Sequence, residues 1–240
     1  RGCLVSAMRV LRGRAATPEA DRDATAELLE RAGETGEPTL RVWRPHRQIA
    51  FGRRDATAEN YEAARSIARE HGFAPIERSV GGRAVAYTGT TLAVAHARPI
   101  EDVRQGLEER YGDALDRLGT ALARLGVDAE PGEPPNSFCP GTHSLQAESR
   151  KLAGVAQRVK QDAALVAAVV VVDDRRKIAD VLDPIYDALD VPFDPDTVGS
   201  VASAGGPADP DAVARTIEDA IAGDRATTVE YLSESHFRDV

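Results

Sequence analysis

The apolar and polar positions along the chain follow two periods, one typical of β-strands and one typical of α-helices. Alternation of apolar and polar residues predicts strands over residues 39–43, 48–52, 73–77 and 90–97. Apolar residues three and four positions apart predict helices over residues 18–32, 57–71, 103–125 and 210–222. A glycine follows three of these helices, so we expect each to end at Gly33, Gly72 or Gly126.

The second half of the chain carries the most hydrophobic segment. Residues 165–172 are apolar and mostly β-branched, which predicts a central strand covered on both faces. After it, residues 178–189 are expected to form short helical turns interrupted by Pro184, and residues 191–211 a flexible loop. With 240 residues, 42% of them hydrophobic, the chain suits one large α/β domain or two small ones.

Composition excludes several classes of function. A net charge of −9 argues against nonspecific nucleic-acid binding, and no apolar run is long enough to span a membrane. Two cysteines cannot form a secreted disulfide framework, so we expect a reducing compartment such as the cytoplasm. The absence of zinc-type Cys/His spacing disfavours a metal site. Met8 is a possible native start, which would make residues 1–7 a leader.

The main candidate for chemistry is the segment around Cys139 and Lys151. Its alternating residues and turn signals predict a hairpin-like pair of strands that brings the thiol and the ammonium together. A nearby cation favours the thiolate, so the pair is a plausible acyl-transfer centre. A cysteine is nevertheless more often a buried small hydrophobe. Lys151 is one of only three lysines in a chain that otherwise uses arginine, which makes an incidental lysine there less expected.

Two other features carry weaker indications. Gly81 and Gly82 let the backbone approach a ligand closely, although an ordinary tight turn is the more common use of such a pair. His96 lies in a predicted strand and has no catalytic partner in the sequence. We therefore interpret His96 as a packed or surface histidine.

Two motifs together resemble the lipoate/octanoate protein ligase and acyltransferase superfamily, which shares the biotin/lipoyl protein ligase catalytic domain. One is Cys-Pro-Gly-Thr-His-Ser-Leu from Cys139, followed by Arg-Lys-Leu-Ala-Gly-Val-Ala-Gln-Arg from Arg150. The other is Arg-Ser-Val-Gly-Gly-Arg-Ala-Val from Arg78. Within the superfamily they are most like the octanoyl amidotransferase branch. The resemblance implies an α/β (α+β) fold in which helices flank a mixed β-sheet, with residues 1–240 forming a single catalytic domain.

The resemblance also implies roles for individual residues. Cys139 would carry an octanoyl or lipoyl group as a thioester, and Lys151 would bind the acyl carbonyl and favour the thiolate. Backbone N–H groups near Gly81 and Gly82 would serve as oxyanion donors. The expected partners are the glycine-cleavage H protein and the lipoyl domains of 2-oxoacid dehydrogenases, and no cofactor is required. The substrate-binding residues implied by the matching motifs are Arg78, Ser79, Gly81, Gly82, Ala84, Gly141, His143 and Gly154.

The sequence departs from the family pattern at two positions, which leaves alternatives open. Ser144 stands where the family usually has Asp, and His143 stands where the amidotransferases have Tyr. One alternative is an ATP- and Mg-dependent lipoate ligase that uses Lys151 on the adenylate. This alternative is weakened by Ser144 and by the lack of a His-Gly pair after the Gln-Arg segment. The other is a relative that binds lipoyl domains or acyl groups without catalysis.

Overall fold

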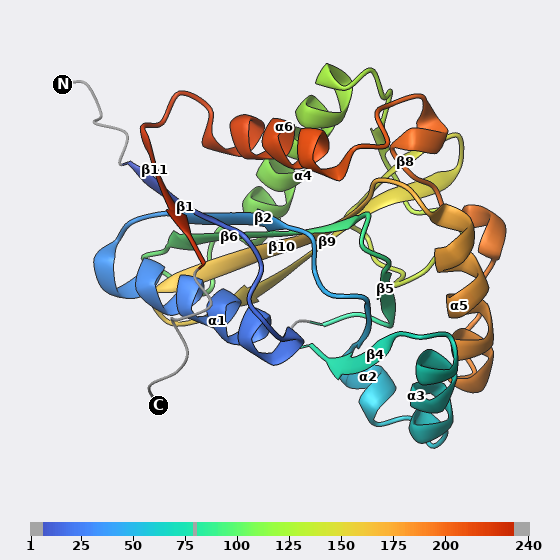
Figure 1. Cartoon of the computed structure of the whole chain (residues 1–240). Coiled ribbons are helices and arrows are strands. Elements are labelled where there is room, and N and C mark those ends of the chain that lie inside the picture. Colours follow the sequence, from blue (N-terminus) through green and yellow to red (C-terminus); the bar gives the residue numbers. More distant parts are fainter. Residues whose placement is uncertain (1–6, 79–80, 233–240) are drawn as a thin grey trace.

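The computed structural model describes residues 7–78 and 81–232, and its largest element is an eight-stranded mixed sheet (Figure 1). The strand order is β11-β1-β2-β6-β10-β9-β8-β7. β1 pairs in parallel with both β11 and β2, and the remaining neighbours are antiparallel. The strands are β1 (Met8–Arg12), β2 (Thr39–Trp43), β6 (Thr91–Pro99), β7 (Glu130–Pro131), β8 (Ser144–Ala147), β9 (Arg150–Val159), β10 (Ala163–Val171) and β11 (Thr227–Tyr231).

Helices cover both faces of this sheet, which confirms the expected mixed sheet flanked by helices (Figure 1). On one face, α4 (Leu107–Arg124) and α6 (Pro210–Ala222) pack on alternate side chains of β1, β2, β6 and β10. On the other face, α1 (Pro18–Thr35) packs against β6 and β10. β10 lies between β6 and β9 and is buried on both sides, as its apolar sequence predicts.

A second, three-stranded sheet stands beside the first and has the order β4-β3-β5. It packs with α5 (Arg175–Ala188), α3 (Tyr61–Glu70) and the short α2 (Arg53–Ala56). Its strands are β3 (Gln48–Phe51), β4 (Ala74–Glu77) and β5 (Val85–Tyr87). The predicted strands 39–43 and 48–52 therefore belong to different sheets. Pro45 and its neighbours turn the chain out of the first sheet before β3 begins.

Four helices differ from their predicted extent. α3 and α4 begin at Tyr61 and Leu107, each four residues later than expected. α1 continues through Gly33 and ends at Gly36, whose left-handed backbone (φ 70°) lets its N–H bond the carbonyl of Ala32. α5 is continuous through Pro184 instead of breaking there. An internal proline costs about 3 kcal/mol, but one whole face of α5 is buried, and that packing keeps the helix intact.

The segment after α5 makes defined contacts. It contains the 3₁₀ helices η1 (Pro195–Thr197) and η2 (Ala202–Ala204). Val198 and Val201 are fully buried, and the N–H of Gly199 donates to the carbonyl of Lys151. This part of the chain therefore packs directly behind the strand that carries Lys151.

Candidate active site

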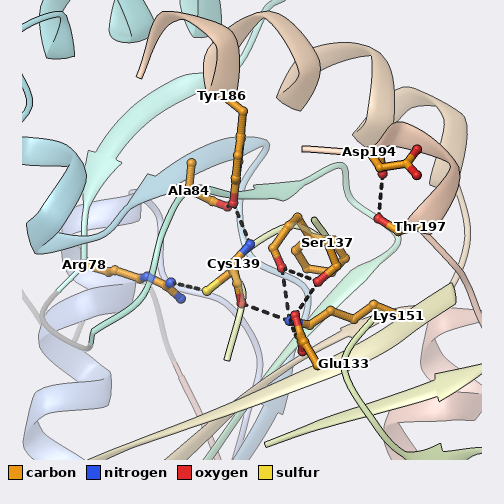
Figure 2. A network of polar contacts seen from close by, with 10 residues as sticks. Arg78, Ala84, Glu133, Ser137, Cys139, Lys151, Tyr186, Asp194 and Thr197 are labelled. Carbon is orange, nitrogen blue, oxygen red and sulfur yellow. Dashed lines mark hydrogen bonds and ion pairs between the residues drawn. The ribbon is translucent and has the colours of Figure 1, made fainter. Parts of the chain in front are cut away.

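Cys139 lies in the loop between β7 and β8, with its backbone in the left-handed region at φ 44°. The phenol oxygen of Tyr186 on α5 accepts a hydrogen bond from the Cys139 N–H at 2.5 Å and donates to the carbonyl of Ala84 at 2.9 Å (Figure 2). Burial raises the pKa of Tyr186 well above its ordinary value, so the phenol stays protonated and can make both bonds. Tyr186 thereby fixes the backbone on one side of the cysteine.

Lys151, at the start of β9, fixes the other side. Its Nζ atom donates to the carbonyls of Cys139 at 2.9 Å and Phe138 at 3.1 Å. It also bonds both carboxylate oxygens of Glu133, at 2.9 and 3.0 Å. Only 1% of the lysine side chain is exposed, and its three N–H donors are engaged by these four oxygens. Ser137 also donates to Glu133, and Figure 2 shows this contact beside those of Lys151.

The cation in contact with the sulfur is Arg78. Its Nη2 atom lies 3.0 Å from Sγ of Cys139 and 2.7 Å from the carbonyl of Arg83. Burial alone would lower the pKa of Arg78, but its interactions with Cys139 and Tyr87 outweigh this and raise it, so the guanidinium stays charged. The ammonium of Lys151, expected at the sulfur, binds the backbone carbonyl of the cysteine instead. Its catalytic role remains a prediction.

Gly82 allows the sulfur and the guanidinium to meet. A Cβ atom on Gly82 would lie 2.6 Å from Sγ of Cys139 and 2.4 Å from Nη2 of Arg78, and its φ of +104° suits glycine. Gly52 is equally restricted, because its Cβ would lie 1.8 Å from the Gly82 carbonyl oxygen. A Cβ on Gly81 would meet nothing within 4 Å. Of the predicted glycine pair, Gly82 is thus the one that packs against the reactive atoms.

A cavity of about 170 Å³ opens beside the sulfur. Small residues of β6, β9 and β10 leave this space next to the sheet, among them Ala93, Ala95, Ala156 and Ala167. The cavity is also lined by Trp43 and by residues of α1. Cys139, Arg78 and Lys151 therefore share one largely apolar cavity.

Three other predicted residues, Gly141, Gly154 and His143, lie near Cys139 and Lys151. Gly141 lines the cavity, and Gly154 makes room for Lys151, whose Cε would lie 3.2 Å from a Cβ there. The ring of His143 stacks on Tyr111 of α4, with centroids 3.6 Å apart. Its Nε2 atom lies 3.4 Å from a carboxylate oxygen of Glu108.

Two further positions of these motifs are Ser144 and Ser79. Ser144, where the family usually has Asp, is buried, and its carbonyl accepts from the N–H of Gly132. Ser79, expected to bind substrate, lies outside the described residues.

Three residues of the site were not predicted from the sequence. Glu133 sits in a Pro- and Gly-rich loop, and Tyr186 sits on a helix predicted to be broken. Tyr87 lies beside Arg78, and burial raises its pKa to about 12, although the charge of Arg78 acts in the opposite direction. A lone buried tyrosine gives no periodic signal in sequence. The Glu133 contact depends on a loop that only the tertiary fold places.

Neither a metal site nor a membrane span is found in the described part of the chain. No group of three or more His, Cys, Asp or Glu side chains among residues 7–78 and 81–232 could hold a metal ion. None of the helices in the same ranges combines the length and apolar content needed to cross a bilayer.

The fold is that of the lipoate–protein ligases. The solved structure of lipoate-protein ligase A bound with ATP superposes with a TM-score of 0.76 at 18% identity, covering 96% of this chain and 90% of that chain. Residues 19–222 match the model of the lipoyl protein ligase A/B catalytic domain, and the chain belongs to this family.

Curated relatives are acyl-transfer enzymes. An octanoyl-GcvH:protein N-octanoyltransferase of Geobacillus kaustophilus is 28% identical over 127 residues, which is 53% of this chain and 44% of that protein. The enzyme of the same name from Kyrpidia tusciae is 34% identical over 131 residues, which is 54% of this chain and 45% of that protein. The match thus spans less than half the length of these relatives.

Proposed function

We propose that this protein transfers an octanoyl or lipoyl group, held as a thioester on Cys139, to a lysine of a lipoyl-domain protein. The observation that carries the proposal is the position of Sγ: on the wall of an apolar cavity and 3.0 Å from a guanidinium. The names of the curated relatives support the octanoyl transfer, though not the thioester, and point to the glycine-cleavage H protein as the acyl donor.

The cavity supports a medium-length acyl group. An engineered apolar cavity of about 150 Å³ binds benzene, a molecule of six carbon atoms. A space of about 170 Å³, lined in part by alanines, therefore suits a chain of similar or slightly larger carbon content, such as octanoyl.

The proposed reaction has two steps. The Cys139 thiolate attacks the carbonyl carbon of the donor's octanoyl-lysine amide and a C–S bond forms. The C–N bond then breaks, and the donor lysine leaves as a neutral amine after its nitrogen takes up one proton from solvent. The neutral amine of the acceptor lysine then attacks the thioester. A C–N bond forms, the C–S bond breaks, the thiolate returns and the surplus proton passes to solvent.

Arg78 would serve both steps from one position. A positive charge in contact with Sγ stabilises the thiolate before attack and again when it leaves. The oxyanion that develops in each step is only two bonds from the sulfur, within reach of the same guanidinium. Lys151 would act through the backbone, because its ammonium holds the carbonyls of Phe138 and Cys139 and so keeps the thiol directed at Arg78.

The test is a single-turnover experiment. The protein is incubated with octanoylated H protein, and its intact mass is measured before and after addition of a lipoyl-domain acceptor. We expect an octanoyl adduct on Cys139 that hydroxylamine removes and that disappears as the acceptor gains the same mass. Cys139→Ala should give neither adduct nor transfer.

Two other outcomes would contradict the proposal, and each would identify a different function. Octanoylation of the acceptor that survives Cys139→Ala and requires ATP would identify an adenylate-forming ligase. Binding of the lipoyl domain without transfer from any acyl donor would identify a non-catalytic relative. Running wild type and Cys139→Ala in parallel, with and without ATP, separates all three.

A further inference from the structure

A second, small cavity lies on the opposite face of the sheet, beneath α4. It has a volume of about 20 Å³, enough for a single water molecule or a monatomic ion. Apolar side chains form part of its wall, among them Val166 and Leu118. The remainder is unusually polar for a site beneath a helix: it is lined by His96, Arg98, Arg110, Asp113 and Arg117.

Two of these residues carry hydrogen-bonding nitrogens without a partner in the described protein. His96 is 7% exposed and Arg110 is 6% exposed. Nε2 of His96 and Nη2 of Arg110 are both buried and unbonded. The other guanidinium nitrogens of Arg110 are satisfied, because Nε donates to Gln157 at 2.9 Å and Nη1 to the carbonyl of Gln105 at 2.8 Å. A buried donor left unpaired costs about 1–3 kcal/mol, so an acceptor is expected between them.

The strand register places His96 and Gln157, the partner of Arg110, in one row. His96 pairs with Val166, and Val166 pairs with Gln157, so the three residues form one row across β6, β10 and β9. Nε of Arg110 is held by Gln157 at one end of this row, and His96 lies at the other end. Both His96 and Arg110 line the same cavity of about 20 Å³, so one small acceptor in it would lie beside both side chains.

The charge of the wall favours an anion as that acceptor. Three arginines line the cavity, and a single carboxylate, Asp113, is shared between Arg98 at 2.9 Å and Arg117 at 2.8 Å. The side chains that line the cavity therefore carry a net positive charge. Glu109 offsets part of the charge of Arg110 from an exposed position outside the cavity.

The protonation states of His96 and Arg110 are consistent with an anion bound between them. Burial lowers the pKa of His96 to about 3, and the charges of Arg98 and Arg117 act in the same direction, so the imidazole is neutral and adds no charge. A neutral imidazole can still present one N–H at Nε2. Burial and the like charge of Arg98 also lower the pKa of Arg110, a penalty that a bound anion would relieve.

We propose that this cavity binds one monatomic anion, chloride under physiological conditions, between Nε2 of His96 and Nη2 of Arg110. A water molecule would accept from the same two donors but would leave the surplus positive charge in place. The anion would fasten α4 to β6 and β9, and its role would be structural, since it lies across the sheet from Cys139.

The first test uses the wild-type chain. Its thermal unfolding is followed in sodium chloride and in sodium gluconate at equal ionic strength. We expect chloride to raise the Tm by about 2–4 °C, and the increase should grow with the logarithm of the chloride concentration, as for a ligand that binds only the folded state. Crystals grown in sodium bromide should show an anomalous bromide peak between His96 and Arg110. Equal Tm values in the two salts together with an empty or water-only cavity would overturn the proposal.

A pair of variants locates the effect. Arg110→Gln removes one of the two donors and should abolish the difference in Tm between chloride and gluconate. Arg124→Gln removes the same charge from an exposed position on the same helix and should keep that difference. If Arg110→Gln retains the full chloride response, the anion binds elsewhere and the proposed site is wrong. The bromide experiment on the wild type decides the question should Arg110→Gln fail to fold.

Discussion

The Nη2 atom of Arg78 lies 3.0 Å from the Sγ atom of Cys139, although the two residues are 61 positions apart in the chain. The contact joins the segment after β4 to the loop before β8, and Gly82 is the residue that leaves room for it. The electrostatic partner of the thiol is therefore an arginine from a distant motif.

Replacing Arg78 by methionine should slow alkylation of Cys139 by iodoacetamide at pH 7. A hydrogen bond to a charged group contributes about 1.5–3 kcal/mol, so its loss should reduce the rate roughly 10- to 100-fold because the guanidinium no longer stabilises negative charge on the attacking sulfur. Arg54→Met, on the exposed surface of α2, is the matched control and should react like wild type. An unchanged rate in Arg78→Met would show that the guanidinium does not activate the sulfur.

Gly82→Ala should abolish acyl-adduct formation, while Gly81→Ala should leave it close to wild type. The new methyl group at position 82 would overlap both Sγ and the guanidinium, whereas at position 81 it would meet nothing within 4 Å. The strained backbone at φ +104° should also lower the free energy of unfolding by about 1–3 kcal/mol. Intact-mass measurement of the adduct and urea denaturation give the two readouts. Equal behaviour of the two variants would contradict the geometry.

Tyr186→Phe should lower both stability and acylation rate. Without the hydroxyl, the buried N–H of Cys139 and the carbonyl of Ala84 lose their partner, which costs about 1–3 kcal/mol. The comparison is Tyr111→Phe, which keeps the ring stacked on His143 and should have little effect. Urea denaturation combined with the rate of octanoyl-adduct formation checks the prediction, and a Tyr186→Phe protein indistinguishable from wild type would refute it.

Lys151→Met should be strongly destabilising, by about 3–5 kcal/mol, because it leaves the partly buried carboxylate of Glu133 and two carbonyls unpaired. Adding Glu133→Gln should recover part of this loss. A double-mutant cycle measured by urea denaturation gives the coupling between the two residues. Strictly additive effects would mean that the ion pair does not stabilise the loop.

The buried His96 predicts a dependence of stability on pH. Its pKa is about 3 in the folded protein and about 6.5 in the unfolded chain, so below pH 6.5 the unfolded state takes up a proton that the folded state does not. The free energy of unfolding should therefore fall by roughly 1.4 kcal/mol for each pH unit between about pH 6.5 and pH 3. Urea denaturation at pH 7.5 and pH 5, at fixed chloride concentration, measures this loss. His96→Leu should remove it, and an identical pH dependence in both proteins would exclude His96 as its source.

Periodicity predicted most of the helices and the central strands. β10 carries a run of β-branched residues and α6 carries an apolar stripe, and both patterns are stable only when they are buried in the core. The predicted bounds of both elements lie close to the observed ones. Sheet membership was harder to predict. β2 and β3 have similar alternation, and only the turn at Pro45 and the pairing with β4 and β5 place β3 in the smaller sheet.

Four residues of the candidate site were predicted from the sequence, but the contacts between them were not. The motifs placed Cys139, Lys151, Arg78 and Gly82 near one another, and the structure brings all four together. The sequence could not show which cation meets the sulfur, because that depends on the left-handed backbone at Cys139 and on the carbonyl groups that it turns toward Lys151. Glu133 and Tyr186 could be identified as site residues only from the tertiary structure.

The first and last described strands, β1 and β11, run side by side, and Arg9 on one bonds Glu230 on the other across 221 positions of sequence. Neither strand was predicted, although each has five residues, as β2 does. A ribosome must therefore make every element between them before β1 gains this neighbour. Until β11 has been made, the hydrogen-bonding groups along that edge of β1 are open to other chains, so the nascent protein is exposed to misassociation there.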